Sequence, residues 1–211
     1  MAVLSCMEIE KATANFLSKY QDQLECKTYG YEEVVRSEGG HDPRIYIIKE
    51  GVFRIGRIDA WKSDITVCFA FNPHVIVPVS SIVTGFPSLF QIKSIKNSLA
   101  NSNSLYEISI EQWNSLVGED IVLKNLPKFV THDNLVTFIN LFSILRQNRK
   151  TEEIFSIMYD AQDPILNSGI PDKYVADFFG ITTDTLRRIF NSKRLSKNKR
   201  LEPSQAATVS A

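Results

Sequence analysis

The residues best suited to bind another molecule lie near the C-terminus of this 211-residue chain. Residues 185–200 contain seven basic side chains and no acidic one. These are Arg187, Arg188, Lys193, Arg194, Lys197, Lys199 and Arg200. Lysine and arginine neutralise phosphate groups, and arginine also binds guanine edges through two hydrogen bonds. The segment therefore favours an anionic partner such as nucleic acid, with a solvated basic tail as the alternative.

Two short helices joined by a tight turn are predicted around this basic segment. Pro171 suits the first turn of one helix, and Gly180 follows its end. Thr182 or Thr183 then caps a second helix, with Asp184 in its first turn, where the helix dipole favours an acidic group. This pattern is typical of a helix-turn-helix, whose second helix enters the major groove of DNA, although a generic helical hairpin can also produce it.

The outward positions of the second helix are the candidate DNA contacts, and double-stranded DNA is the expected partner. We assign Arg187 and Arg188 to base edges, and Asn191 can bind adenine. Hydroxyl groups and free N–H groups at the start of a helix suit phosphate. The full set of candidate contacts is Thr182, Thr183, Asp184, Arg187, Arg188, Asn191 and Lys193.

The net charge of the whole chain argues against a nucleic-acid partner. With 24 basic and 24 acidic side chains, the formal charge is zero, which is unusual for a nucleic-acid-binding protein. The charges are unevenly distributed, however, because residues 1–184 contain 17 basic and 23 acidic groups. The sequence therefore joins an acidic body to a basic C-terminal end.

The first half of the chain predicts one helix followed by short strands. Apolar residues recur at helical spacing in residues 8–20, and the pattern changes to period two over residues 31–110. Ile65–Phe71 alternates as a half-buried strand does. Residues 44–49 and 52–58 are separated by Glu50-Gly51, which predicts a hairpin. Many short strands with frequent turns favour an antiparallel sandwich or barrel-like roll.

Helices are predicted again from residue 111 onward, first over residues 111–117 and then over 127–149. The longer helix has apolar residues on more than one stripe, so two of its faces need to be covered. That property suits the seam of a symmetric homodimer, with burial inside its own domain as the alternative. The residues expected at the seam are Leu135, Phe138, Phe142 and Leu145.

The order of these parts resembles the Crp/Fnr family of bacterial transcription regulators. Three stretches carry the likeness: YIIKEGVFR at 46–54, IEQWNSL at 110–116, and IPDKYVADFFGITTDTLRRI at 170–189. The resemblance implies an α+β fold with an antiparallel double-stranded β-roll, a long dimerisation helix and a C-terminal winged helix-turn-helix. The implied boundaries are 1–125 for the cyclic-nucleotide-binding-like roll, 126–150 for the dimerisation helix, 151–200 for the DNA-binding domain and 201–211 for a flexible tail.

One segment departs from the family's cyclic-nucleotide members. Their cassette has a Glu that binds the ribose and an Arg that neutralises the cyclic phosphate, whereas the aligned positions here are Pro78 and Ser88. Because a buried phosphate needs a positive partner or several donors, we predict no tight binding of cAMP. The candidate pocket for an unknown small-molecule effector is lined by Ser80, Ser81, Phe86, Ser88 and Phe90.

Other function classes find little support in the sequence. His41, His74 and His132 are scattered singly, and three wide-spaced cysteines suit neither a disulfide framework nor a thiolate cluster. We therefore expect no metal, no cofactor and no enzymatic activity. No apolar run is long enough to span a membrane, so a cytoplasmic protein is predicted. RNA polymerase is a further expected partner, and the alternative function is a small-molecule or protein-interaction module with vestigial DNA binding.

Overall fold

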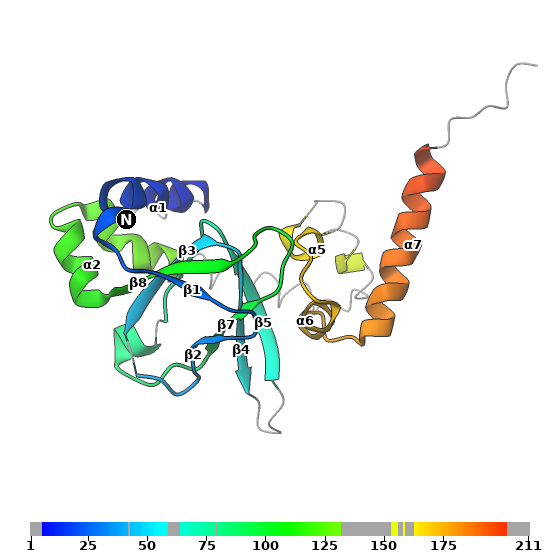
Figure 1. Ribbon diagram of the computed structural model, residues 1–211, viewed down its shortest axis with the longest axis horizontal. Helices are drawn as coiled ribbons and strands as arrows, with labels where there is room; N and C mark the ends of the chain where they lie inside the picture. Colours follow the sequence, from blue (N-terminus) through cyan, green and yellow to red (C-terminus); the bar gives the residue numbers. More distant parts are fainter. Residues whose placement is uncertain are drawn as a thin grey trace, which may run out of the picture.

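The computed structural model describes residues 6–41, 43–58, 64–78, 80–131, 153–155, 158 and 163–201 (Figure 1). The strands are β1 (Cys26–Tyr29), β2 (Val34–Arg36), β3 (Arg44–Glu50), β4 (Val52–Ile58), β5 (Asp64–Phe71), β6 (Val75–Ile76), β7 (Gln91–Ile95) and β8 (Asn103–Ser109). The α-helices are α1 (Cys6–Tyr20), α2 (Ile110–Val117), α5 (Pro164–Asn167), α6 (Asp172–Phe178) and α7 (Thr183–Leu201). Residues 121–131 are also helical, and a π-helical turn spans Ser80–Thr84.

The strands form two antiparallel four-stranded sheets with the orders β1-β8-β3-β6 and β2-β7-β4-β5. Apolar residues of the two sheets form a core that includes Tyr46, Ile48, Phe53, Ile92 and Leu105. Every strand pairing in the described chain is antiparallel. The predicted α+β fold with an antiparallel β-roll is therefore confirmed.

The predicted hairpin between residues 44–49 and 52–58 is wrong in its pairing, although both strands exist. β3 pairs with β6 and β8, whereas β4 pairs with β5 and β7. Gly51, with a φ of 87°, turns the chain from one sheet into the other. A Cβ at this position would lie 1.8 Å from Oδ1 of Asn103, so the Asn103 side chain leaves room only for glycine here.

Asn103 is fully buried where the two sheets meet, and its side chain has all of its hydrogen bonds satisfied. Its Oδ1 accepts the backbone N–H of Val52 at 3.1 Å and the side-chain amide of Asn97 at 2.8 Å. Its Nδ2 donates to Oγ of Ser94 and to the carbonyl of Ile95, both at 2.7 Å. One amide therefore joins β4, β7 and β8 at the corner of the roll.

Replacing Asn103 by alanine is expected to lower the free energy of unfolding by about 3 kcal/mol, because it leaves buried donors and acceptors without partners. Denaturant unfolding followed by circular dichroism measures this loss. Asn101→Ala is the matched control, since Asn101 is exposed two residues earlier and its removal should change stability by less than about 0.5 kcal/mol. Equal stability of the two variants would contradict the role given to Asn103.

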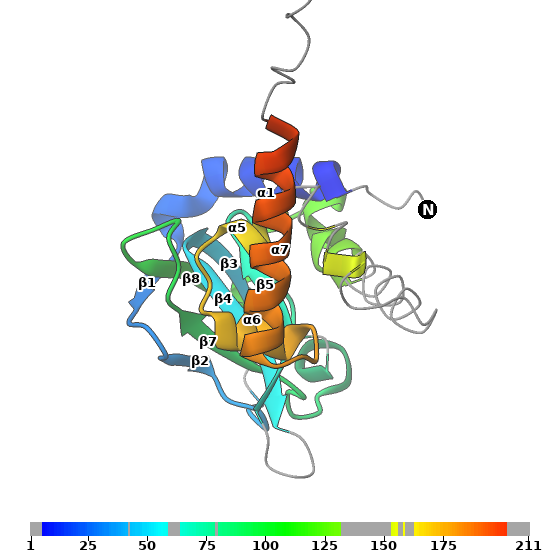
Figure 2. The same ribbon diagram turned by 90° about the vertical axis from the view of Figure 1, so that its right-hand side faces the viewer.

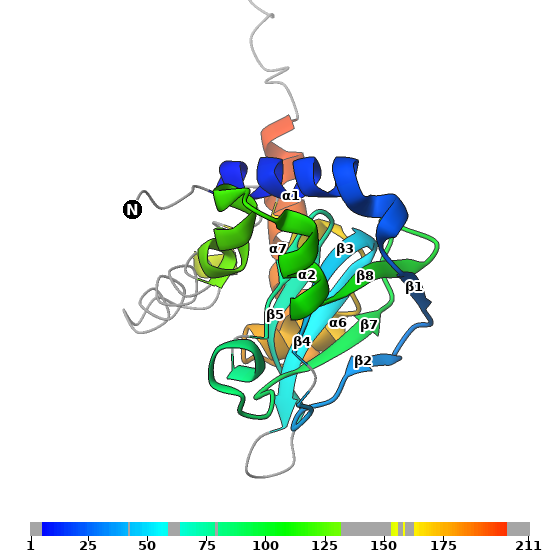
Figure 3. The ribbon, with the colours of Figure 1, turned by 90° about the vertical axis from the view of Figure 1, so that its left-hand side faces the viewer.

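One sheet is covered by α1, α2 and the helix over residues 121–131 (Figure 3). Phe16 of α1 stacks on Trp113 of α2 with ring centroids 4.4 Å apart, and both are buried together with Ile45 and Ile47 of β3. Ser109 caps α2 by accepting the backbone N–H of Gln112 at 3.1 Å. Across the described ranges, no helix combines the length and the apolar character needed to cross a membrane.

The C-terminal helices α5, α6 and α7 lie at the other end of the roll (Figures 1 and 2). Their apolar residues share one core with the roll, which includes Val52, Phe69, Ile95, Phe155, Tyr174, Val175, Phe179, Leu186 and Ile189. Phe69 of β5 contacts Phe178 of α6 with ring centroids 5.7 Å apart. Residues 132–150, which contain the predicted seam residues Leu135, Phe138, Phe142 and Leu145, lie outside the described part of the chain.

Candidate nucleic-acid interface

The turn between α6 and α7 is set by Gly180. The N–H of Gly180 donates to the carbonyl of Asp177 at 3.0 Å, and the N–H of Ile181 donates to the carbonyl of Ala176 at 2.9 Å. These two bonds form a Schellman ending, in which the residue after the helix takes a left-handed conformation. Gly180 has a φ of 64°, which glycine adopts without steric cost. The predicted helix-turn-helix is thus present as α6, a glycine turn and α7.

α7 begins at Thr183, and Thr182 is its N-cap. Oγ1 of Thr182 accepts the backbone N–H of Thr185 at 3.2 Å and lies 3.0 Å from Oγ1 of Thr185. Asp184 follows in the first turn, where the helix dipole favours it, with 94% of its side chain exposed. The choice that the sequence left open between Thr182 and Thr183 as the cap is therefore settled in favour of Thr182.

The two helices hold each other through a small aromatic and aliphatic core. Leu186 and Ile189 of α7 are buried against Val175 and Phe179 of α6. Phe155 contacts this pair, with its ring centroid 5.6 Å from that of Phe179. Because this core fixes the inner side of α7, its opposite side remains available to solvent.

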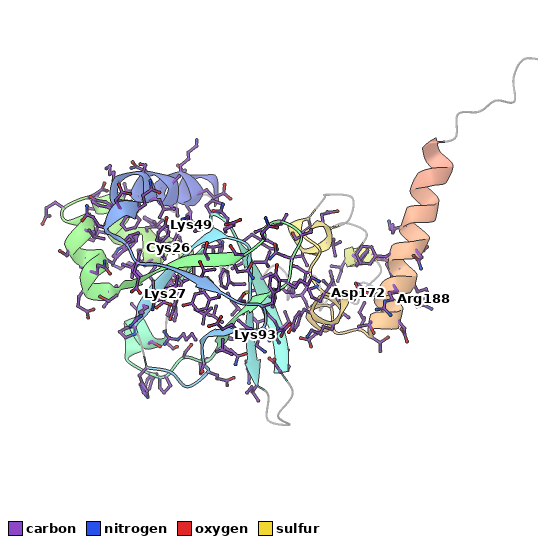
Figure 4. The ribbon with its side chains drawn as sticks, in the orientation of Figure 1. Cys26, Lys27, Lys49, Lys93, Asp172 and Arg188 are labelled. Atoms are coloured by element: carbon purple, nitrogen blue, oxygen red, sulfur yellow. The ribbon has the colours of Figure 1, made fainter. Side chains whose placement is uncertain are left out.

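The exposed side of α7 carries most of the predicted DNA contacts. Asp184, Arg187, Arg188 and Asn191 are exposed, while Thr183 and Lys193 are half-buried. Arg188 lies on α7 at the end of the molecule opposite α1 and α2 (Figure 4). The structure thus brings the predicted residues together on one helix, with the hydroxyl of Thr182 at its start.

Arg187 pairs with an acidic residue at the start of α6. Its Nε donates to Oδ2 of Asp172 at 2.8 Å, so it links the start of α6 to α7. Its Nη1 also lies 4.0 Å from Oδ1 of Asp184. An exposed pair of this kind contributes little and exchanges easily. Arg187 thus links α6 to α7 in the unbound protein, while Arg188 and Asn191 are exposed on the same helix.

α7 is longer than the second helix of a winged helix-turn-helix needs to be. It continues to Leu201, and no strand of the wing expected within residues 151–200 follows α6 in the part of the chain that the structure describes. The reason is local, because no Gly or Pro interrupts the sequence between Gly180 and Pro203. The basic residues 193–200 therefore lie on the same helix as the candidate base contacts.

Glu32, in the turn before β2, connects the roll to α6. Its Oε1 lies 3.3 Å from Nζ of Lys173, and its Oε2 accepts a hydrogen bond from the hydroxyl of Tyr174. Burial opposes ionisation of Glu32, but the hydrogen bonds from Tyr174 and Lys173 outweigh it and hold the pKa of Glu32 below its usual value. Burial and the bond to Glu32 raise the pKa of Tyr174, so the phenol remains a donor.

The candidate effector residues occupy the π-helical turn and the loop that follows it. Ser81 and Ser88 are buried, Ser80 is half-buried, and Phe86 and Phe90 are 68% and 38% exposed. Oγ of Ser88 donates to the carbonyl of Phe90 at 2.9 Å, so this hydroxyl is already used within the loop. Phe86 therefore lies largely in solvent, Phe90 is partly covered, and Ser81 and Ser88 are buried.

A guanidinium from outside the aligned cassette does reach this segment in the folded chain. Arg36 of β2, which is 5% exposed, donates from Nη2 to Oγ of Ser81 at 2.6 Å and to the carbonyl of Gly40 at 3.0 Å. Its Nη1 lies 3.4 Å from the hydroxyl of Tyr46. Arg36 is 45 residues away from Ser81, and reading the aligned cassette alone misses it. The one sign of this contact in the sequence is that an arginine directly follows the apolar residues Val34 and Val35.

The cysteines and potential metal ligands give no reactive cluster in the described residues, where no three His, Cys, Asp or Glu side chains converge. Cys68 lies on β5, and burial raises the pKa of its thiol to about 12. Cys26 on β1 is exposed (Figure 4). Since the thiolate is the reactive form, Cys68 is suited to packing rather than to redox sensing.

Alkylation should separate these two cysteines. With iodoacetamide at pH 8, we expect the peptide containing Cys26 to be labelled at least about 100-fold faster than the peptide containing Cys68, because burial suppresses both access and thiolate formation. Mass spectrometry of the digested protein measures both rates. In denaturant the rates should become equal, and rapid native labelling of Cys68 would refute its assignment to the core.

The comparisons with known proteins found similarity in the fold but not in the sequence. No protein-family model matches the sequence, and no curated protein matches it either. FixK2 from Bradyrhizobium japonicum has a similar structure, with a TM-score of 0.63 and 14% identity over 82% of this chain and 86% of that one. The c-di-GMP-responsive global regulator CLP of Xanthomonas campestris has a TM-score of 0.58 and 11% identity, over 87% and 93% of the two chains.

The catabolite activator protein of Thermus thermophilus is also similar, with a TM-score of 0.50 and 12% identity over 92% of this chain and 85% of that one. At such low identity these likenesses concern the fold alone. They show that the chain has a Crp/Fnr-like fold, as the order of its parts predicts.

Proposed function

We propose that this protein is a sequence-specific DNA-binding transcription regulator of the Crp/Fnr type. The observation that carries the proposal is the pair of helices α6 and α7. Their glycine turn and shared core bury one side of α7 and leave Arg188 and Asn191 exposed on the other. An arginine and an asparagine on the outer face of such a helix can read guanine and adenine in the major groove. The Crp/Fnr-like fold supports the same assignment, and no catalytic activity is expected.

Phosphate contacts come from the rest of α7 in this proposal. Thr183, in the first turn of the helix, lies where backbone N–H groups favour an anion. Lys193 and the basic residues that follow it on the same helix add positive charge. Arg187 can join them because its exposed pair with Asp172 costs little to break.

We further propose that the protein works as a homodimer in the cytoplasm, with residues 126–150 as the dimerisation helix and with Leu135, Phe138, Phe142 and Leu145 at the seam. Two-fold symmetry then requires a roughly palindromic operator with half-sites about 34 Å apart, one turn of DNA. RNA polymerase and a small-molecule effector are the remaining proposed partners. The domain boundaries 1–125, 126–150, 151–200 and 201–211 belong to the same proposal.

A second candidate is a protein-interaction module in which DNA binding is vestigial. The loop before β7 favours it, because Phe86 and Leu89 are 68% and 64% exposed and lie three residues apart. Exposed apolar groups close together are typical of an interaction site. The two candidates differ in one respect that is easily measured, namely whether the protein binds duplex DNA.

Duplex DNA selected from a random library should bind with an affinity that falls steeply as salt rises, because counterions are released from phosphates. Arg188→Ala should cost about 1–3 kcal/mol on the selected sequence and relax the preference at one base position. Lys193→Ala should weaken all sequences alike and reduce the slope of log affinity against log salt by about one. Fluorescence anisotropy between low and moderate salt measures both effects.

Glu119→Ala provides the control for these variants, since Glu119 is exposed in the turn after α2, far along the chain from the candidate interface. It should leave both affinity and salt slope unchanged. Absence of DNA binding by the unmodified protein at low salt would exclude the regulator function and favour the interaction module.

Cyclic AMP is not expected to bind, because Pro78 and Ser88 replace the ribose and phosphate partners and Arg36 already donates to Ser81 and Gly40. In a thermal-shift measurement, millimolar cAMP should change the melting temperature by less than about 1 °C, whereas the selected DNA should raise it. A rise of several degrees with cAMP would show that the folded pocket compensates for the altered cassette.

A further inference from the structure

The guanidinium of Arg54 is buried between the roll and the helix-turn-helix. Arg54 is on β4 and is 1% exposed. Its Nε donates to Oγ1 of Thr66 at 2.7 Å, and its Nη1 donates to Oδ1 of Asp64 at 2.8 Å. On the other side, its Nη2 lies 3.7 Å from Oδ2 of Asp177, and its Cζ lies 5.1 Å from the ring centre of Tyr174. Two partners therefore come from β5 and two from α6.

A buried guanidinium is costly unless charges and acceptors surround it. Asp64 is 42% exposed and neutralises only one side of Arg54, and the carboxylate of Asp177 adds negative charge from α6. Nη2 has no hydrogen-bond partner among the described residues, so the contact with Asp177 is an ion pair at 3.7 Å and not a hydrogen bond. Space for the group comes from Gly56, where a Cβ would lie 2.8 Å from Cζ of Arg54. The sequence thus provides both the room for this charge and a partner for it on each side.

The same carboxylate covers an open edge of the roll. β5 is the last strand in the order β2-β7-β4-β5, so some of its backbone groups have no partner strand. The backbone N–H of Thr66 donates to Oδ2 of Asp177 instead. Edge strands of native proteins are usually protected by a covering element. Asp177 therefore binds both a side chain and the backbone of the roll, and α6 is the covering element.

Further charges continue this contact along α6. Nζ of Lys93 on β7 lies 3.7 Å from Asp64 and 3.9 Å from Glu32, and Glu32 contacts Lys173 and Tyr174 as described above. Glu32 is the only described residue other than glycine with a positive φ, at 65°. An L-residue is held in that conformation only when its surroundings determine it. The contact between the roll and α6 is thus extended and specific.

We propose that Arg54 is a positioning residue for DNA binding: through Asp177 and Tyr174 it holds α6, and with it the exposed face of α7, in the position that binds DNA. This proposal rests on the proposed function. With α6 docked on β5, Arg188 on α7 lies at the end of the molecule away from α1 and α2 and is exposed (Figure 4), so docking leaves the candidate contacts open to DNA. Arg54 touches no DNA in this arrangement and acts through α6.

The test compares Arg54→Met with Arg57→Met. Methionine keeps much of the length of arginine without its charge, and Arg57 lies on the same strand but is exposed. Arg54→Met should weaken binding to the selected DNA by about tenfold or more, because the loosened helix pair must be ordered on binding. Arg57→Met should bind as the unmodified protein does.

Amide hydrogen exchange gives a readout that does not depend on DNA. In Arg54→Met, exchange at the amide of Thr66 should become at least about tenfold faster, because Asp177 is no longer held over it. The amide of Val52, which donates to Asn103, should keep its rate and so confirm that the roll remains folded. Asp177→Asn should also weaken DNA binding, and the double variant should lose little more than Arg54→Met alone because both act through one contact.

Unchanged or stronger DNA binding by a folded Arg54→Met protein would overturn the proposal. Additive losses in the double variant would do the same, because they would mean that Arg54 and Asp177 act independently. If the unmodified protein binds no DNA, the proposed function fails, but exchange at Thr66 still decides whether Arg54 holds α6 in place.

Discussion

The arrangement of the C-terminal half depends on the burial of one positive charge at Arg54. Because the guanidinium is enclosed, its neighbours have to provide space, acceptors or negative charge. Gly56 leaves space, Asp64 and Thr66 accept hydrogen bonds, and Asp177 places a carboxylate 3.7 Å from Nη2. The apolar contact between Phe69 and Phe178 lies in the same interface. Apolar packing favours contact in many orientations, whereas the charge is satisfied in few, so Arg54 selects the orientation of α6.

Features that depend on neighbours in the sequence could be predicted from it. Gly180, Thr182 and Asp184 act within a few residues of their own positions, and the turn, the cap and the first helical turn were located correctly. The alternating residues 65–71 likewise gave the strand β5. Local conformational preferences and short-range hydrogen bonds decide all of these features, so the nearby residues are sufficient to predict them.

Features that depend on distant partners could not be predicted in the same way. Glu50-Gly51 was correctly identified as a turn, but β3 and β4 pair with distant strands and not with each other. Asn103, about fifty residues later, fills the space beside Gly51 and accepts the N–H of Val52. Arg36 ends an apolar strand and Arg54 interrupts one, which signals a buried charge but not its partner. The partners Ser81 and Asp177 come from other elements, so only the fold brings them together. The wing was predicted by likeness to a family, whereas the uninterrupted residues 181–201 favour one long helix.

The candidate effector segment and the helices α6 and α7 both contact the sheet β2-β7-β4-β5. Arg36 on β2 pairs with Ile92 on β7, Ile92 pairs with Ile55 on β4, and Arg54 is the residue before Ile55. A ligand that displaced the Arg36 side chain from Ser81 would therefore act on a strand two positions away from the one that holds α6. Glu32, in the turn before β2, also contacts Lys173 and Tyr174 of α6. The β2 region is therefore connected to α6 in two ways, along the sheet through β7 and β4 and directly through Glu32.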